Sequence, residues 1–207
     1  MAGFKDFVNG LPLYESEIDG YLMRQTVMRF GTTTQLTNAL TAGIREVGML
    51  AWADNTGVLY MWDGSNWIPW QSPQKAATLA FTAGGNQVTV SNAIVNTWWW
   101  YSGGMVKLNW RFVIGSSTNM QSGSYALALP IATRAELDHH YLGQCTYYDQ
   151  SADTTYHRAA ATLGTTTSVG FVDSNGTRLS TTLPVAPANN DQFGMSLVYP
   201  PSTGTYL

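Results

Sequence analysis

Residues 105–114, MVKLNWRFVI, decide the fold that the sequence predicts. Every second position is apolar: Val106, Leu108, Trp110, Phe112 and Ile114. The positions between them hold Lys107, Asn109, Arg111 and Val113. A period of two residues is typical of a β-strand with one buried face. Ten residues is long for a strand in a small domain, so we expect a central strand.

Turn signals flank this strand on both sides. Gly103 and Gly104 precede it, and Gly115 begins the turn that follows. A second apolar run, residues 125–129, ends at Pro130 and lies within hairpin distance. The spacing predicts that this run pairs with residues 105–114 and that further strands extend the pair.

Composition favours an all-β chain and argues against two classes of partner. Hydrophobic residues make up 44% of the 207 residues, and charged residues only 11%, against roughly 25% in typical soluble domains. The polar surface must therefore consist largely of Thr, Ser, Asn, Gln and Gly, which favour strands and turns over helices. A net charge of −3 offers no basic surface for nucleic acid or for a membrane.

The single cysteine and the N-terminal segment bear on where the protein is made. Cys145 is the single cysteine, so no intrachain disulfide is expected, and a small buried residue is its simplest role. Residues 1–13 lack the continuous apolar stretch of a signal peptide, and no segment has the length and apolar character of a membrane span. These features predict synthesis in the cytoplasm without a signal peptide.

Residues 1–72 are predicted to form a small module with short helices and a β-meander, which would anchor the chain. Short helices are expected near residues 16–22 and 32–43, with an extended run at 26–30 between them. Three short strands separated by turns are expected over residues 48–70. The aromatic side chains of this meander supply its packing area: Trp52, Tyr60, Trp62, Trp67 and Trp70.

Residues 76–207 are predicted to form an antiparallel β-sandwich of the jelly-roll type, after a polar linker around Pro73. Turn signals separate short strands throughout, with no helical period between them. The expected strands are 78–81, 87–90, 97–101, 105–114, 124–129, 141–148, 156–163, 168–172 and 192–199.

Aromatic clusters in this half have two interpretations. On a strand, Trp98 and Trp100 face one way, and Trp99 and Tyr101 face the other. Such residues either pack between layers or subunits, or form an exposed platform that stacks on sugar rings. The same two interpretations apply to Tyr147, Tyr148, Tyr156 and His157.

No motif for catalysis or for metal binding stands out. His139 and His140 are adjacent and would point to opposite faces of a strand, and no H-x-x-x-H or C-x-x-C spacing occurs. Nucleophile elbows, P-loops and dinucleotide fingerprints are absent from the sequence. The spacing of the carboxylates singles out no pair for glycoside hydrolysis. We therefore predict no catalytic residues, no metal ligands and no cofactor.

The N-terminal half resembles small virion proteins of tailed phages that infect actinobacteria, which are usually labelled minor tail, tail-fibre or head-fibre proteins. The resemblance rests on EIDGYLMRQTVMRF at residues 17–30, GMLAW at 48–52 and LYMWDGSNW at 59–67. Where such relatives often carry an Ala-Arg-Asp-like helix start, this chain has TTQL at 33–36.

The C-terminal half resembles trimeric knob domains of phage fibres, similar in architecture to the jelly roll of tumour necrosis factor and complement C1q. The matching features are Gly104 with the strand that follows it, GSY at 123–125 leading to Pro130, and NDQF at 190–193 leading into a closing strand. Together the two resemblances cover nearly the whole chain.

The resemblance implies a homotrimeric virion structural protein whose N-terminal part attaches to other virion proteins. Leu22, Met23, Val27 and Phe30 would belong to this anchor. The apolar residues of 105–114 would lie in the core or at the three-fold axis. The expected function is adhesion to a host cell-wall glycan; a capsid decoration or head-fibre protein is the alternative, and a cell-wall-degrading enzyme is a third class.

Overall fold

The structure is a computed structural model and describes residues 27–39, 45–137, 140–162, 165–173, 176–180, 182 and 186–202. The chain divides into two compact units. Unit 1 comprises Met1–Ser72 with Tyr206–Leu207, and unit 2 comprises Pro73–Thr205. Strands predominate in the described part of both units, which confirms the mainly β class.

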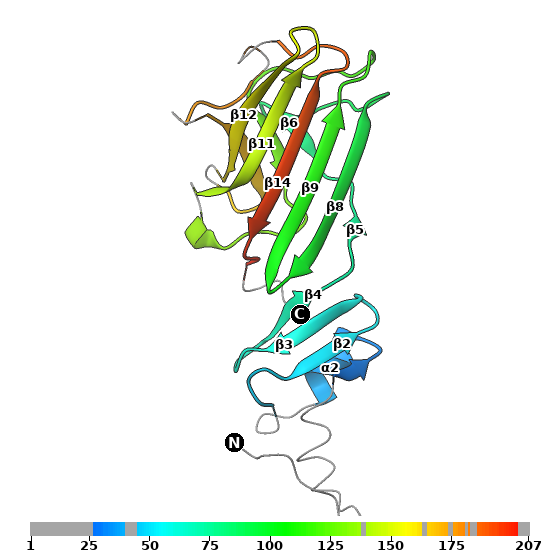
Figure 1. Cartoon of the computed structure of the whole chain (residues 1–207). Coiled ribbons are helices and arrows are strands. Elements are labelled where there is room, and N and C mark those ends of the chain that lie inside the picture. The colour runs from blue at the N-terminus through cyan, green and yellow to red at the C-terminus, as the bar shows by residue number, and fades with distance from the viewer. Residues whose placement is uncertain are drawn as a thin grey trace, which may run out of the picture. The chain divides into compact units, whose positions relative to one another are not determined.

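In its described residues, unit 1 has a four-stranded sheet and one helix beside it (Figure 1). Its elements are β1 (Met28–Phe30), α2 (Thr33–Ala39), β2 (Leu50–Ala53), β3 (Val58–Trp62) and β4 (Trp67–Gln71). β1 pairs in parallel with β2, and β2, β3 and β4 pair antiparallel in sequence order. The last three strands are the meander expected over residues 48–70.

Local signals explain where these elements begin and turn. The hydroxyl oxygen of Thr32 accepts the N–H of Gln35 at 3.1 Å, and the Gln35 side-chain oxygen accepts the N–H of Thr32 at 3.1 Å. This reciprocal pair is a capping box that starts α2. Asp63 closes the turn before β4 by accepting the N–H groups of Ser65 and Asn66 at 2.8 and 2.7 Å. The helix expected near residues 16–22 lies outside the described residues.

Unit 2 is an antiparallel sheet that curls into two facing layers. Its elements are β5 (Lys75–Ala76), β6 (Phe81–Ala83), β7 (Asn86–Gln87), β8 (Ile94–Ser102), β9 (Met105–Val113), β10 (Tyr125–Ala128), η2 (Ala135–Leu137), β11 (Tyr141–Asp149), β12 (Thr154–Ala161), β13 (Ser168–Val172) and β14 (Gln192–Tyr199). The strand order is β8-β9-β14-β11-β12-β13-β10-β6-β7, with β5 pairing to β8.

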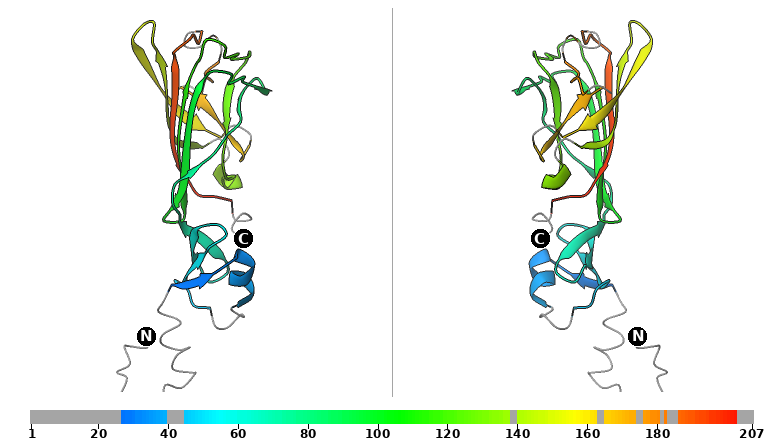
Figure 2. Two further views of the ribbon diagram at one scale, coloured as in Figure 1. Left: turned by 90° about the vertical axis from the view of Figure 1, so that its right-hand side faces the viewer. Right: turned by 90° about the vertical axis from the view of Figure 1, so that its left-hand side faces the viewer.

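We call β8, β9, β14, β11 and β12 the front layer, and β13, β10, β6 and β7 the back layer. The edge-on views show the two layers facing each other (Figure 2). β12 pairs with β13 only over Ala159–Ala161, so the sheet turns from one layer to the other there. Gly103 and Gly104, with φ of 62° and 76°, form the tight turn between β8 and β9.

Aromatic rings fill the space between the layers. Phe81 of β6 lies 5.0 Å from Trp110 and 5.1 Å from Phe112 of β9, and 5.6 Å from Phe193 of β14, measured between ring centroids. Tyr125 of β10 stacks on Phe81 at 5.4 Å. These inward-pointing rings join the two layers across the core.

The strand at residues 105–114 is central, as its length predicts, because β9 pairs with β8 on one side and β14 on the other. Its predicted hairpin with residues 125–129 is wrong. β10 lies in the back layer, where it pairs with β6 and β13. The intervening loop carries the chain to the other layer, where Tyr125 and Leu127 are buried, so the apolar faces of β9 and β10 meet across the core instead of side by side.

Candidate functional site

The outward-facing side chains of the front layer form the surface that we call the outer face. Strand register aligns them in rows across the sheet. One row runs Trp98, Asn109, Ser196, Gln144 and Ala159; the next runs Asn96, Arg111, Gly194, Thr146 and His157. Trp100, Lys107 and Val198 form a row on one side of these two, and Ile94, Val113, Gln192, Tyr148 and Thr155 form a row on the other.

Exposed aromatic rings lie on this face. Trp98 is 47% exposed, and Trp100 and Tyr148 are half-buried. Trp98 and Trp100 are two residues apart on β8, so their rings project from the same side of one strand. An aromatic ring held on a rigid strand offers an apolar surface on which the flat face of a sugar can stack.

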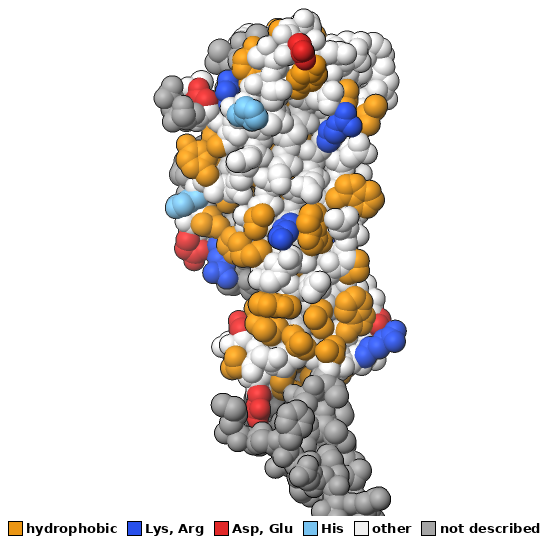
Figure 3. Space-filling model, viewed as in Figure 1, with side chains coloured by type: hydrophobic (Ala, Val, Ile, Leu, Met, Phe, Trp, Pro, Cys, Tyr) orange, Lys and Arg blue, Asp and Glu red, His pale blue; other side chains and the backbone are white. Residues whose placement is uncertain are grey.

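Neutral hydrogen-bonding groups occupy the centre of the outer face. Asn109 of β9, Ser196 of β14 and Gln144 of β11 are exposed and lie side by side in that order. Figure 3 shows this region as largely white, with orange aromatic and aliphatic side chains around it. Such amide and hydroxyl groups can both donate and accept hydrogen bonds, as sugar hydroxyls do.

Gly194 keeps the middle of the outer face flat. It lies between Arg111 of β9 and Thr146 of β11. A Cβ atom at this position would lie 2.8 Å from the hydroxyl oxygen of Thr146, so a larger residue would require a shift of that side chain. The backbone of β14 is therefore open to a ligand that lies across the strands.

Three other residues predicted for glycan contact point away from this face. Trp99 points inward, lies at 5.6 Å edge-on to Tyr101 and carries the Lys75 ammonium 5.3 Å above its ring. Tyr147 is fully buried, and Tyr156 stacks on it at 6.0 Å. The structure thus gathers Trp98, Trp100, Tyr148 and His157 on the outer face and separates the other three from them.

Tyr147 belongs to a buried hydrogen-bond network around Asp191. Its hydroxyl donates to one carboxylate oxygen of Asp191 at 2.5 Å, and the N–H groups of Gln150 and Ala188 donate to Asp191 at 3.0 and 2.7 Å. Burial and then the Asp191 carboxylate raise the pKa of Tyr147 well above its ordinary value. Tyr147 is therefore a structural residue that holds two loops at the end of β11.

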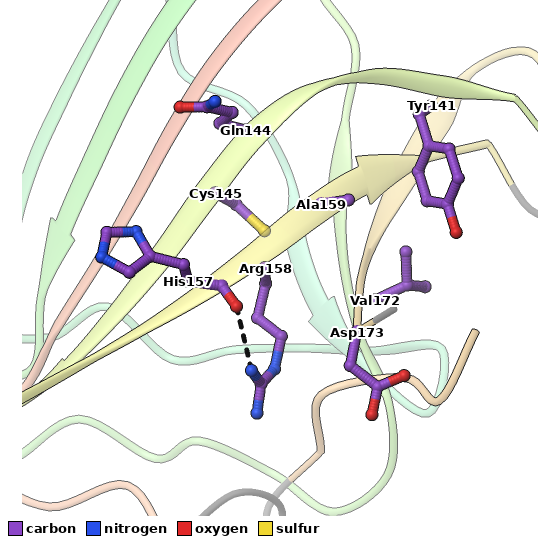
Figure 4. A pocket seen from close by; sticks show the side chains of 8 residues that line it. All are labelled: Tyr141, Gln144, Cys145, His157, Arg158, Ala159, Val172 and Asp173. Atoms are coloured by element: carbon purple, nitrogen blue, oxygen red, sulfur yellow. Dashed lines mark hydrogen bonds between the residues drawn. The ribbon is translucent and has the colours of Figure 1, made fainter. Parts of the chain in front are cut away.

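An open pocket of about 590 Å³ lies beside β11, β12 and the end of β13, and it shares Gln144, His157 and Ala159 with the outer face (Figure 4). It is lined by Tyr141, Gln144, Cys145, His157, Arg158, Ala159, Val172 and Asp173. The Arg158 guanidinium extends into it and donates to the carbonyl oxygen of His157 at 2.9 Å. Burial raises the pKa of the Cys145 thiol to about 12, although the charge of Arg158 opposes the shift. This thiol is therefore protonated and weakly nucleophilic near neutral pH.

The residues predicted for the core or a trimer axis are all buried within a single chain. Val106, Leu108 and Phe112 have no exposed surface, and Trp110 and Ile114 are each 3% exposed. Of the residues predicted for the anchor, Leu22 and Met23 lie outside the described part of the chain. Val27 is 53% exposed, and Phe30 is half-buried in β1.

Titratable residues do not converge on a reactive centre in the part of the chain that the structure describes. No group of three His, Cys, Asp or Glu side chains among the described residues could hold a metal ion. Asp149 accepts hydrogen bonds from the Ser151 hydroxyl at 2.7 Å and from the N–H groups of Ser151 and Ala152, and these bonds lower its pKa. Asp149 therefore stabilises the turn that follows β11. Asp153 accepts a hydrogen bond from the Tyr148 hydroxyl at 2.9 Å.

A second surface lies in unit 1, and two of its residues, Trp52 and Trp70, are among the aromatics that the sequence predicts as packing area of the meander. One side of its sheet is buried, and the other carries half-buried apolar side chains that register places together: Leu50, Trp52, Leu59, Met61 and Ile68. Trp70, two positions after Ile68 on β4, is half-buried as well. Figure 3 shows orange side chains gathered over these strands. The signal in the sequence is that both faces of each short strand are apolar, which marks a sheet covered on two sides.

Comparison with known proteins leaves the chain without an identified family: no family model, no curated protein and no solved structure matches it. In the described residues, no helix has the length and hydrophobicity needed to cross a bilayer.

Proposed function

We propose that the protein is a phage virion structural protein, and that unit 2 is a knob that adheres to a glycan of the host cell surface. The observation that carries the adhesive role is the outer face, where the exposed ring of Trp98 and the half-buried ring of Trp100 lie beside a row of exposed polar side chains: Asn109, Ser196 and Gln144. This combination of an aromatic platform with neutral hydrogen-bonding groups fits a carbohydrate better than a protein surface or a nucleic acid.

The virion assignment rests on the sequence resemblance of residues 17–67 and of the segments around Gly104, Gly123 and Asn190. The proposal includes a homotrimer and a jelly-roll knob. Two facing antiparallel layers with an aromatic core support the knob architecture, and the closed shape of a sandwich suits a terminal adhesive domain.

Glycan binding tests this proposal. The full-length protein is applied to an array of bacterial cell-wall polysaccharides, and affinity for any captured glycan is measured by titration calorimetry. We expect Trp98→Ala to reduce the affinity at least about fivefold, because a stacking ring contributes about 1–3 kcal/mol in comparable aromatic contacts.

Tyr141→Ala is the matched control. Tyr141 is 61% exposed and lines the pocket beside β11, so it is an aromatic ring outside the rows of the outer face. Both variants must keep the circular dichroism spectrum of the unaltered protein. Adhesion through the outer face is contradicted if both variants lose affinity for the glycan equally. It is also contradicted if the folded protein binds no glycan.

One observation favours a second candidate, a capsid decoration or head-fibre protein. The half-buried apolar surface of unit 1, centred on Met61 in register with Leu50 and Ile68, is of the kind that marks a protein interface. In that role the attachment of unit 1 to the shell would be the main function. The test is whether the Met61→Asp variant is still incorporated into phage particles. If this variant is not incorporated, and the unaltered protein binds no glycan, decoration is favoured over adhesion.

A further inference from the structure

We infer that the glycan bound by the outer face carries negative charge, as carboxylate or phosphate groups, and that Lys107 and Arg111 of β9 bind those groups. The inference rests on the proposed adhesive function and specifies its ligand. Two features carry it: both cations lack an anionic partner, and the outward strand positions around them hold no carboxylate.

Lys107 is the first of the two cations. Register places it between Trp100 of β8 and Val198 of β14 on the outer face. Among the described residues, none forms a hydrogen bond, an ion pair or a ring contact with its ammonium group. The ammonium therefore projects beside an aromatic ring with its positive charge uncompensated, which suits a ligand that both stacks and carries an anion.

Arg111 is held in place by a neutral side chain. Its Nε and Nη2 atoms donate to the Oε1 atom of Gln192 at 3.2 and 2.9 Å. The amide oxygen orients the guanidinium without neutralising it, and Nη1 remains available. In unit 1, by contrast, the Nε atom of Arg29 lies 2.9 Å from Asp54, where a carboxylate compensates the charge. A preoriented arginine with free donors binds carboxylate or phosphate well.

The outward strand positions of the outer face hold no acidic residue. At the outward positions of β8, β9, β14, β11 and β12, all of which the structure describes, no residue is Asp or Glu. Asp149, at the end of β11, and Asp191, just before β14, are buried. The nearest exposed carboxylate in sequence, Asp153, lies in the turn after β11 and accepts the hydroxyl of Tyr148. A chain with a net charge of −3 thus presents a locally positive face, which attracts anions from solution.

The spacing of the two cations suggests a polymer. Lys107 and Arg111 are four residues apart on one strand, which corresponds to about 13 Å along its axis. A single carboxylate or phosphate could not reach both groups, whereas a chain with repeated acidic groups could contact both at once and gain affinity from the pair.

The test uses the full-length protein and three immobilised polysaccharides: polygalacturonate, which carries carboxylates, phosphomannan, which carries phosphates, and neutral dextran. We expect binding to one or both anionic polymers, weakened when sodium chloride rises from about 50 to about 500 mM, because salt screens charge contacts. The Lys107→Gln and Arg111→Gln double variant should lower this affinity at least about tenfold. Arg134→Gln, an exposed arginine outside the front layer, should leave it unchanged.

The outcomes separate this inference from the proposal on which it rests. Preference for polygalacturonate or for phosphomannan supports it and identifies the acidic group. Binding to dextran with equal affinity, insensitive to the double variant, overturns it and leaves glycan adhesion standing. Failure of the folded protein to bind any polysaccharide, including those of the cell-wall array, overturns both.

Discussion

Tyr147 and Tyr148 are neighbours in sequence with opposite environments. The Tyr147 hydroxyl donates to the buried carboxylate of Asp191, whereas the Tyr148 hydroxyl donates to the exposed Asp153. Tyr147→Phe should lower the free energy of unfolding by about 1–3 kcal/mol, because a buried acceptor loses a donor. Tyr148→Phe, the matched control, should change it by less than about 0.5 kcal/mol.

Urea denaturation of both variants measures this difference. Both substitutions remove one tyrosine hydroxyl. A difference between their free energies of unfolding must therefore come from the surroundings of the two hydroxyls. Equal midpoints for the two variants would show that the network around Asp191 does not stabilise unit 2.

Cys145 should resist modification in the folded protein. Burial raises the pKa of its thiol to about 12, and the side chain is 2% exposed. Near pH 8 the reactive thiolate is therefore scarce, and a disulfide reagent such as dithionitrobenzoate should label the native chain far more slowly than the unfolded chain in urea. Cys145→Ser gives the blank, because the chain has no other cysteine. Rapid stoichiometric labelling without urea would contradict the buried position.

Asp149 should make the fold sensitive to acid. The Ser151 hydroxyl, together with backbone N–H groups, lowers the pKa of this carboxyl below its ordinary value of 3.8. A carboxyl with a lowered pKa in the folded state stabilises that state above its ordinary pKa, and the stabilisation is lost as the pH falls through the lowered value.

Asp149→Asn should therefore lose less stability than the unaltered protein when the pH falls from about 6 to about 3. Ser151→Ala, which removes the main cause of the shift, should lie between them. Urea midpoints at the two pH values provide the measurement, and parallel acid losses in all three proteins would rule out this role for Asp149.

At the scale of single elements, β9 shows the cost of removing an inward side chain. Leu108 has no exposed surface, whereas Asn109 is exposed on the outer face. Leu108→Ala should lower the free energy of unfolding by about 2–5 kcal/mol, through lost burial and the cavity left behind. Asn109→Ala should change it by less than about 0.5 kcal/mol. Similar losses for both would mean that the two faces of β9 are equally buried.

Most elements could be predicted because their signals are local. The bounds expected for β13 and β14, 168–172 and 192–199, are those observed. The meander was also expected from its alternating apolar residues and its Asp, Asn and Gly turns. Alternation and turn residues act within a few positions of the chain, so a sequence shows them directly.

Strand partners could not be predicted in the same way. The apolar run of β10 fits a hairpin with β9 equally well until the tertiary contacts of Tyr125 and Leu127 are known. The outer face has the same limitation: Arg111 and Gln192 are 81 positions apart, and only the pairing of β9 with β14 brings them together. Alternation showed that Trp98 and Trp100 share a face, but not that this face is the open one.

At the scale of the whole molecule, the homotrimer is the part of the proposal that one measurement decides. Multi-angle light scattering of the purified chain at micromolar concentration should give three times the mass of one chain. A monomer mass would remove any axial role for the apolar residues of β9, which a single chain already buries. It would leave the glycan test on the outer face unaffected, because that face lies within one chain.

The position of β14 has a consequence for how the protein is made. β14 is the last of the described strands in the sequence, yet it lies in the middle of the front layer, between β9 and β11. While a ribosome is still adding residues before Gln192, β9 and β11 have no strand between them, and the rings of Phe112 and Tyr147 lack their contact with Phe193. The front layer can therefore be completed only after β14 has been synthesised. A premature stop codon shortly before residue 192 would produce an open, aggregation-prone chain rather than a slightly shorter knob.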